Sequence, residues 1–180
     1  AVELAYFVAA CYTNVMTTEE TILLTKAMVK HGDVLKLNKY PIIDKHSIGG
    51  IPGNRTTLVI VPIIAAAGYF IPKTSSRSIT SPAGTADTME VLANVAFPLK
   101  KMKQIVLKTN GCIVWGGSLN LAPADDKIIA VERPLEIDAE SQLLASIMAK
   151  KHSVSSTHIL IDVPIGEDAK VKNKLEALKL

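Results

Sequence analysis

The sequence predicts an α/β fold in which a mostly parallel sheet is flanked by helices. Short apolar segments alternate with helical patterns after about residue 40. Two helical patterns precede that point and do not fit the alternation, so we expect them to form a separate helical layer. Two loops rich in glycine and hydroxyl side chains follow predicted strands, which is where ligands bind in parallel sheets.

The two leading helices have clear signals. Apolar residues recur at helical spacing over residues 2–14, which predicts the first helix. Thr17 and Glu20 have the spacing of a capping box, in which each side chain accepts the other residue's backbone N–H, so a second helix is predicted to begin there. Gly32 is a natural end for this helix, because glycine readily adopts the left-handed conformation that closes helices.

The first predicted strands each lead into a polar loop. Residues 41–43 and 69–72 are the predicted strands. A helix over residues 54–67 lies between them, and Pro62 is expected to bend or interrupt it. Another helix is predicted over residues 85–94, directly after the second polar loop.

The rest of the chain continues the alternation. Helices are predicted over residues 99–109, 139–151 and 169–180, and strands over residues 112–115 and 159–163. Residues 118–133 contain a proline and two aspartates and are predicted to be rich in loops. Asp138 is a candidate N-cap for the helix that follows it.

Composition and charge exclude several classes of function. The net charge of +3 is too small and too dispersed to indicate binding to nucleic acid. The longest apolar run, residues 58–71, contains Pro62 and Gly68 and is too short to span a membrane. Cys11 and Cys112 lie in apolar contexts without C-x-x-C spacing, so we expect buried free thiols in the reducing cytoplasm. No pair of histidines has metal-binding spacing, and we expect no metal site.

Two polar loops are the most informative part of the sequence. Residues 44–57 (DKHSIGGIPGNRTT) combine a lysine, a histidine and hydroxyl side chains with three glycines. Glycines let the backbone approach a ligand closely, and the N–H groups at a helix start attract anions. Residues 74–85 add many more hydroxyls and Arg77. We interpret the two loops as a cradle for a ligand with phosphate character. The alternative for the first loop is an ordinary glycine-rich turn between a strand and a helix.

Four motifs resemble those of the thymidine and pyrimidine-nucleoside phosphorylase family. They are KHSIGG at 45–50, SSRSITSPAGT at 75–85, LAPAD at 121–125 and ASIMAKK at 145–151. The motifs occur in family order, and the resemblance covers nearly the whole chain. The IPGN and SPAGT segments are most similar to the archaeal AMP phosphorylase branch and differ from the bacterial form of both loops.

The resemblance implies a catalytic core of two domains. Family members have a small helical domain, discontinuous in sequence, and a larger α/β domain, with a cleft between the two. We therefore expect a small discontinuous all-α domain at residues 1–37 and 123–153, and an α/β domain at residues 38–122 and 154–180. The resemblance further implies a truncated core, because the N- and C-terminal domains of the AMP branch have no counterpart in this sequence.

The resemblance also implies site residues at the matching positions. Phosphate ligands are implied at Lys45, Ser47, Thr57, Ser75 and Thr85. Substrate contacts are implied at Gly50, Ser76, Arg77, Ser78, Ile79, Thr80, Ser81, Thr85, Ser146, Lys150 and Lys170. Cationic side chains in this set suit the anionic oxygens of a phosphate group.

Two residues are candidates for the catalytic acid. Asp138 matches the acid of the AMP branch, which protonates the departing purine, and burial in a closed cleft would raise its pKa and keep it protonated. Asp138, Ser146 and Lys150 are separated by multiples of four residues, so they project toward one side of a helix. His46 matches the proton donor of the pyrimidine branch and ranks second. From the residues alone, the alternatives are an N-cap for Asp138 and a core histidine for His46.

These implications favour phosphorolysis of nucleoside 5′-monophosphates, in which AMP and phosphate give adenine and ribose 1,5-bisphosphate. Inorganic phosphate is the co-substrate, and no cofactor is implied. One alternative is a thymidine or pyrimidine nucleoside phosphorylase. Another is a catalytically incomplete fragment that binds phosphate or nucleotide. We expect a homo-oligomer, a dimer or larger, with no nucleic-acid or membrane partner.

Overall fold

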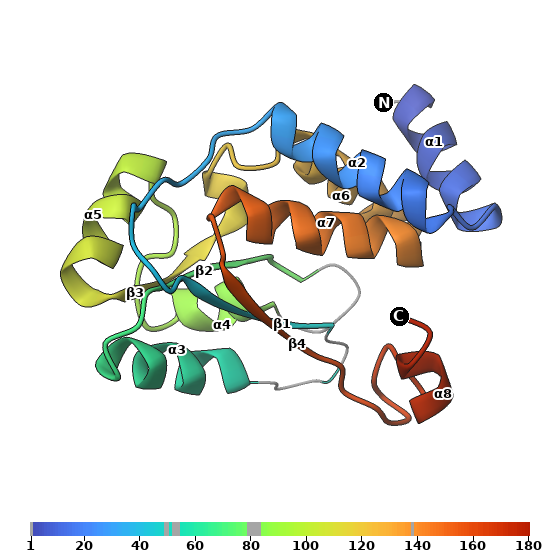
Figure 1. Cartoon of the computed structure of the whole chain (residues 1–180). Helices are drawn as coiled ribbons and strands as arrows, with labels where there is room; N and C mark the ends of the chain where they lie inside the picture. The colour runs from blue at the N-terminus through green and yellow to red at the C-terminus, as the bar shows by residue number, and fades with distance from the viewer. Residues whose placement is uncertain (1, 49–50, 52–54, 79–83, 138) are drawn as a thin grey trace.

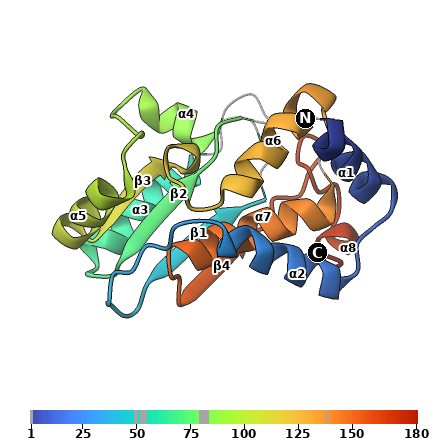
Figure 2. The ribbon, with the colours of Figure 1, turned by 90° about the horizontal axis from the view of Figure 1, so that it is seen from above.

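The computed structural model describes residues 2–48, 51, 55–78, 84–137 and 139–180. A layer of helices covers one face of the strands, and two further helices lie on the opposite face (Figure 1). The first layer consists of α1 (Val2–Thr13), α2 (Thr18–Lys30), α6 (Pro123–Leu135) and α7 (Glu140–Ser153). The opposite face carries α3 (Thr56–Ala66) and α4 (Thr85–Glu90). α5 (Leu99–Thr109) lies beside β2 and β3, and the short α8 (Lys174–Ala177) lies beyond the ends of the strands, near the C-terminus. Figure 2 shows the same arrangement from above.

The strands form two parallel pairs. They are β1 (Ile43–Ser47), β2 (Ile71–Ser75), β3 (Gly111–Trp115) and β4 (His158–Asp162). β1 pairs with β4, and β2 pairs with β3. A parallel bridge between Ile42 and Phe70 joins the two pairs, and the N–H of Ile43 donates to the carbonyl of Phe70 at 2.7 Å. The predicted α/β fold with parallel strands is therefore confirmed, and the strand carboxyl ends lie at one edge.

The first two helices pack on α6 and α7. Their buried side chains form one apolar cluster with those two helices, made by Val8, Met28, Ala122, Ile128, Ala145 and Ala149. The capping box that was predicted to begin the second helix is present. The N–H of Glu20 donates to Thr17 Oγ1 at 3.2 Å, and the N–H of Thr17 donates to Glu20 Oε2 at 2.8 Å. The start of α2, which belongs to the helical layer outside the α/β alternation, is thus set by a local sequence signal.

A second apolar cluster joins the sheet to α5 and to the chain segments that follow α2, precede α6 and follow α7. It consists of Leu35, Leu37, Ile42, Met102, Val106, Val114, Leu119, Leu121 and Val154. Leu99–Thr109 is the helix predicted over residues 99–109, and its apolar side inserts Met102 and Val106 into this cluster. No helix within the described ranges has the length and apolar character needed to cross a membrane.

The first two strands lie further along the chain than predicted. The predicted strand at 41–43 is observed as Ile43–Ser47, and the one at 69–72 as Ile71–Ser75. Each shift moves a charged residue into a buried strand position: Asp44 is fully buried, and Lys73 is only 4% exposed. Apolar pattern alone could not place these strands, because it does not predict charged residues at buried positions. Asp44 is buried against Lys151 of α7, which is distant in sequence.

The segment predicted as loop-rich, 118–133, is mostly the helix α6, so that prediction was wrong. Pro123 occupies the first helical position, where the missing N–H costs nothing. Asp125 and Asp126 lie in the first turn, where the helix dipole favours negative charge. The proline and the aspartates, interpreted as loop signals, are thus the signals of a helix start.

Two predicted helices are shorter than expected. The C-terminal helix predicted over 169–180 is reduced to Lys174–Ala177, because Val171 pairs in a parallel bridge with Ile165 and Asn173 then caps the helix. The side chain of Asn173 accepts the N–H of Glu176 at 3.0 Å. The helix predicted over 85–94 ends at Glu90.

Candidate active site

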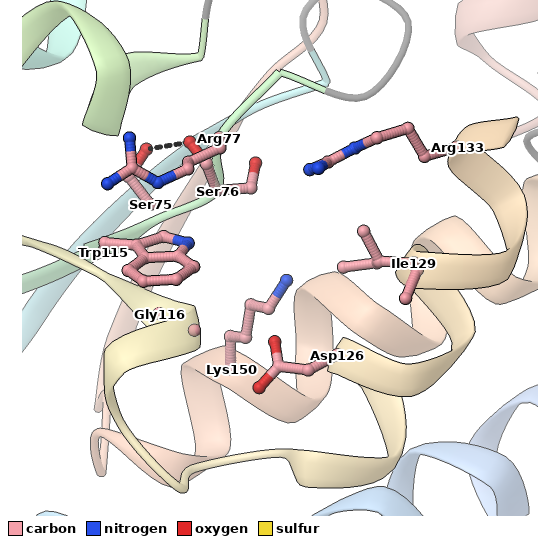
Figure 3. A pocket seen from close by; sticks show the side chains of 11 residues that line it. Ser75, Ser76, Arg77, Trp115, Gly116, Asp126, Ile129, Arg133 and Lys150 are labelled. Carbon is pink, nitrogen blue, oxygen red and sulfur yellow. Dashed lines mark hydrogen bonds between the residues drawn. The ribbon is translucent and has the colours of Figure 1, made fainter.

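A cavity of about 230 Å³ opens between the carboxyl ends of β2 and β3 and the helices α6 and α7 (Figure 3). Its lining consists of Ser75, Ser76, Arg77, Trp115, Gly116, Gly117, Asp126, Ile129, Ala130, Arg133 and Lys150. Ligands of parallel sheets bind at this end of the strands. The cavity lies between the helical layer and the sheet, so a ligand in it would contact both.

The sheet side of the cavity presents hydroxyl groups. Ser75 is the last residue of β2, and its hydroxyl donates to the carbonyl of Ser76 at 3.3 Å. Ser76 follows outside the strand and lines the same cavity. A serine hydroxyl can rotate and donate to an incoming anion, so the second polar loop places donors where a phosphate would be bound.

The helical side presents Lys150 on α7. Its ammonium points into the cavity and lies 2.8 Å from the Asp125 carboxylate, without the alignment of a hydrogen bond. It also donates to the hydroxyl of Ser146 at 3.3 Å, one helical turn earlier. Ser146 and Lys150 therefore act as one unit, as their spacing predicts. Asp125, at 1% exposure, orients the lysine and partly offsets its charge.

Sequence reasoning missed Asp126 and Arg133, which line the cavity from α6. Burial raises the pKa of Asp126, and nearby Asp125 adds to this while Lys150 opposes it. The Arg133 guanidinium extends toward Ser76 (Figure 3) and has no carboxylate within ion-pair distance among the described residues. Both residues belong to the segment predicted as loop. A helix counted from Pro123 would have placed them on one side, since they are seven residues apart.

Arg77 lines the cavity, but its charge is already engaged. Its guanidinium donates to Asp87 at 3.0 Å and to both oxygens of Glu90 at 2.5 and 2.8 Å. It also lies over the Trp115 ring, 4.6 Å from the ring centroid. Hydrogen bonds from Arg77 lower the pKa of Glu90, so this pair stays ionised. The predicted contact between Arg77 and substrate remains a prediction. To bind an anion, the guanidinium would have to divide its N–H groups between that anion and the carboxylates of Asp87 and Glu90.

Asp87 holds two separate points of the second polar loop, at Ser78 and Gly84. Its Oδ2 accepts the N–H of Ser78 at 2.8 Å and that of Gly84 at 2.9 Å. Burial acts to raise the pKa of Asp87, but these two N–H groups and Arg77 outweigh it and lower the pKa. A Cβ on Gly84 would lie 2.5 Å from the carbonyl oxygen of Ser76, so only glycine allows this close approach.

The other implied phosphate ligands lie around the first polar loop and α4. Lys45 is 4% exposed on β1, and its ammonium lies 3.0 Å from the Asp162 carboxylate on β4. Ser47 ends β1, and Thr57 is buried in the first turn of α3. Thr85 is the first residue of α4. Of the five, only Ser75 lines the cavity. The grouping of all five around one phosphate therefore remains a prediction.

The remaining implied residues divide into two groups. Gly50, Ile79, Thr80, Ser81 and Asp138 lie outside the described residues. Lys170 lies in the segment after β4, is half-buried, and does not line the cavity. Ala139 is the N-cap residue of α7 and makes no side-chain capping hydrogen bond. The N-cap alternative for Asp138 falls outside the described residues.

His46, the second candidate acid, is on β1. Burial lowers its pKa well below its ordinary value, and the charges of Lys73, Lys151, Lys150 and Lys45 lower it further. The imidazole is therefore neutral at pH 7. A neutral imidazole holds its proton too tightly to be an effective acid, which weakens the case for His46 as proton donor.

Comparison with known proteins gives the family. The family described as "Glycosyl transferase family, a/b domain" matches residues 39–167. An AMP phosphorylase of Methanococcus vannielii is 55% identical over 99% of this chain, and one of Methanococcoides burtonii is 53% identical over 99%. A protein of Acidovorax sp. (strain JS42) named "Putative thymidine phosphorylase 2" is 54% identical over 98%. The chain covers about a third of these proteins: 35%, 35% and 34% of their lengths.

Solved structures with low sequence identity share the fold. Anthranilate phosphoribosyltransferase from Thermus thermophilus superposes with a TM-score of 0.67 at 16% identity, over 89% of this chain and 54% of that one. The enzyme from Saccharomyces cerevisiae gives 0.71 at 17% identity, over 90% and 46%. The parallel strands, the flanking helices and the sequence match agree: the chain belongs to the glycosyl transferase family with this a/b domain and is homologous to AMP and thymidine phosphorylases.

Proposed function

We propose that the chain is the catalytic core of a phosphorylase that cleaves nucleoside 5′-monophosphates. Phosphate attacks the sugar carbon that bears the base, and AMP then gives adenine and ribose 1,5-bisphosphate. The observation that carries this proposal is the cavity at the strand ends. It faces the hydroxyls of Ser75 and Ser76 with the cations Lys150 and Arg133. A substrate with phosphate groups needs both kinds of donor.

In this proposal the attacking phosphate binds between the two polar loops. Its ligands are Lys45, Ser47, Thr57, Ser75 and Thr85. Ser75 supplies a donor at the end of a parallel strand, and Lys45 supplies a full charge that Asp162 offsets only in part, since the Asp162 side chain is 34% exposed. Holding the phosphate in place converts attack on the sugar into a step within one complex.

The nucleotide occupies the cavity, between the helical layer and the sheet. Lys150 on α7 binds it from one side, supported by Ser146 one turn earlier, and Ser76 binds it from the other, followed by Ser78 two residues along the chain. The Arg133 guanidinium, which has no carboxylate partner in the described ranges, is suited to the 5′-phosphate. An uncharged nucleoside has no group that would pair with this additional cation, so the presence of Arg133 favours a nucleotide as substrate.

Asp138 donates the proton to the leaving base. The neutral state of His46 supports this assignment by elimination. His46 then contributes an uncharged N–H or nitrogen to the site. Its neutrality also spares the site another cation while the sugar itself develops positive charge.

The two layers act as two domains. The helical domain comprises residues 1–37 and 123–153, and the α/β domain comprises residues 38–122 and 154–180. The apolar cluster that α1, α2, α6 and α7 share supports this division. A cleft between the two domains would close on the substrate and exclude water.

A nucleoside phosphorylase is the second candidate, because named thymidine phosphorylases match this chain as closely as AMP phosphorylases do. A substrate panel distinguishes the two. The protein that carries this sequence is assayed for phosphate-dependent release of base from AMP, uridine and thymidine. Faster turnover of AMP supports the proposal, and preference for thymidine or uridine overturns it. Binding of phosphate and AMP without release of base would indicate a binding fragment.

A further inference from the structure

Lys73 is a buried lysine to which neither the sequence motifs nor the proposed reaction assigns a role. It lies two residues before Ser75 on β2, so the two side chains share a face of the strand, about 7 Å apart along it. Lys73 is 4% exposed, and its ammonium donates to the carbonyl of the next residue, Thr74. A lysine in the middle of a fully buried strand is costly, which calls for a physical reason.

The charges around Lys73 do not balance. The ammonium of Lys151, on α7, lies 2.6 Å from the carboxylate of Asp44, on β1, and both residues are buried. Lys73 is adjacent to this pair and close to the Lys151 ammonium. Within the described ranges no carboxylate lies within ion-pair distance of Lys73. The Asp44 carboxylate therefore influences two buried ammonium groups but is paired with only one of them, that of Lys151.

The neighbouring cations have partners of their own. Lys45 pairs with Asp162, and Lys150 pairs with Asp125. Lys73 is thus the ammonium in this cluster whose charge is least compensated by the described residues. An anion bound at the end of β2 would supply the missing negative charge at short range, in a region that water does not screen.

We propose that Lys73 is a positioning residue of the phosphate site: its ammonium fixes the end of β2 through the Thr74 carbonyl and attracts the bound anion from behind Ser75 without touching it. The inference rests on the proposed phosphate site. To that site it adds a cation that does not contact the anion. Lys73 acts by holding the Thr74 carbonyl and by electrostatic attraction at a distance. Because the anion and the charged form of Lys73 stabilise each other, anion binding must be linked to protonation of Lys73.

The pH range of this linkage follows from the surroundings. Burial lowers the pKa of Lys73 to about 7, and Lys151 and Lys150 lower it while Asp44 opposes them. His46, on β1, has a pKa well below its ordinary value, and burial raises the pKa of Cys112, on β3, to about 12. Neither therefore titrates near pH 7. Burial raises the pKa of Asp126, which lines the cavity, so the comparison with Lys73→Met is what assigns an affinity change in this range to Lys73.

Sulfate is the appropriate probe, because its charge is constant between about pH 6 and pH 9, whereas phosphate itself titrates near pH 7. Sulfate affinity is measured by calorimetry for the wild type and for Lys73→Met, Lys73→Arg and Lys108→Met. Lys108 is an exposed lysine on α5, so its variant controls for the loss of one charge. A cooperative thermal unfolding transition is required of each variant, as the check that it is folded.

The wild type and Lys108→Met should lose affinity on the order of tenfold between about pH 6 and pH 8.5. Lys73→Met should bind weakly and without this dependence, and Lys73→Arg should bind tightly across the range. A pH dependence that persists in Lys73→Met overturns the role of Lys73 and leaves the phosphate site intact. Absence of sulfate binding to the folded wild type overturns the phosphate site and this inference with it.

Discussion

The ammonium of Lys151 on α7 lies 2.6 Å from the carboxylate of Asp44 on β1, and both side chains are at most 1% exposed. This ion pair joins the helical layer to the sheet. A buried pair of this kind adds little net stability, but the loss of one partner leaves a buried charge uncompensated. The pair therefore makes a contact between the two layers whose loss would be costly, next in sequence to Lys150, which lines the cavity.

Asp44→Asn should lower the free energy of unfolding by about 3–5 kcal/mol, because two buried ammonium groups then lack a carboxylate. Lys151→Met should cost less, since Lys73 remains beside Asp44. Chemical denaturation at neutral pH measures both. Equal losses in the two variants would show that Lys73 does not share the Asp44 carboxylate.

Lys73 should make stability depend on pH. Its pKa is about 7 in the folded protein against an ordinary value of 10.5, so the unfolded chain binds more protons between these values. The charged form is disfavoured by folding, and the full cost applies below about pH 7. Lys73→Met should therefore raise the unfolding free energy by a few kcal/mol at pH 6. The gain should shrink as the pH rises toward 10. A gain that is constant with pH would contradict this.

The hold of Asp87 on the second polar loop should matter for phosphate binding. Asp87→Asn weakens the hydrogen bonds to the N–H groups of Ser78 and Gly84, and affinity for phosphate should fall roughly tenfold. Glu90→Gln is the matched control, because Glu90 contacts Arg77 but accepts neither of these two N–H groups. An equal loss of phosphate affinity in both variants would assign the effect to Arg77 instead.

Arg133 should contribute to substrate binding. Arg133→Gln removes a guanidinium from the cavity, and the KM for AMP should rise on the order of tenfold or more with a smaller change in kcat. Lys127→Gln, on the same helix but exposed and outside the cavity lining, should leave the KM unchanged. If Arg133→Gln affects thymidine and AMP equally, the guanidinium does not bind the 5′-phosphate.

The sequence predicted the elements whose stability is local. The capping box of Thr17 and Glu20 and the helix over residues 99–109 were found as predicted, because their signals are local in the sequence. Strand positions occupied by Asp44 and Lys73 were missed. The buried carboxylate of Asp44 is paired with Lys151, 107 residues further along the chain, and Lys73 is buried near this pair. No local pattern contains that partner.

The candidate site divides in the same way. Ser75 and Lys150 were identified because they stand in motifs with a recognisable resemblance, and the structure places both at the cavity. Asp126 and Arg133 stand in no such motif, and the prediction of a loop hid their shared helix face. Glu90 could not be foreseen as the partner that engages Arg77, since a single exposed carboxylate on a helix has no specific signal.

The acid gives the last prediction. Asp138→Asn should leave AMP binding largely intact, because asparagine keeps the shape and a hydrogen bond but cannot deliver a proton. Turnover should fall by about a hundred- to ten-thousand-fold, the usual worth of general acid catalysis. The rate of the wild type should decline as the pH rises through the pKa of the acid, and this basic limb should be absent in Asp138→Asn. His46→Gln is the comparison variant, and its smaller loss should leave the limb in place, since His46 is already neutral. A loss below about tenfold in Asp138→Asn with the limb retained, together with a larger loss in His46→Gln, would transfer the role of acid to the histidine.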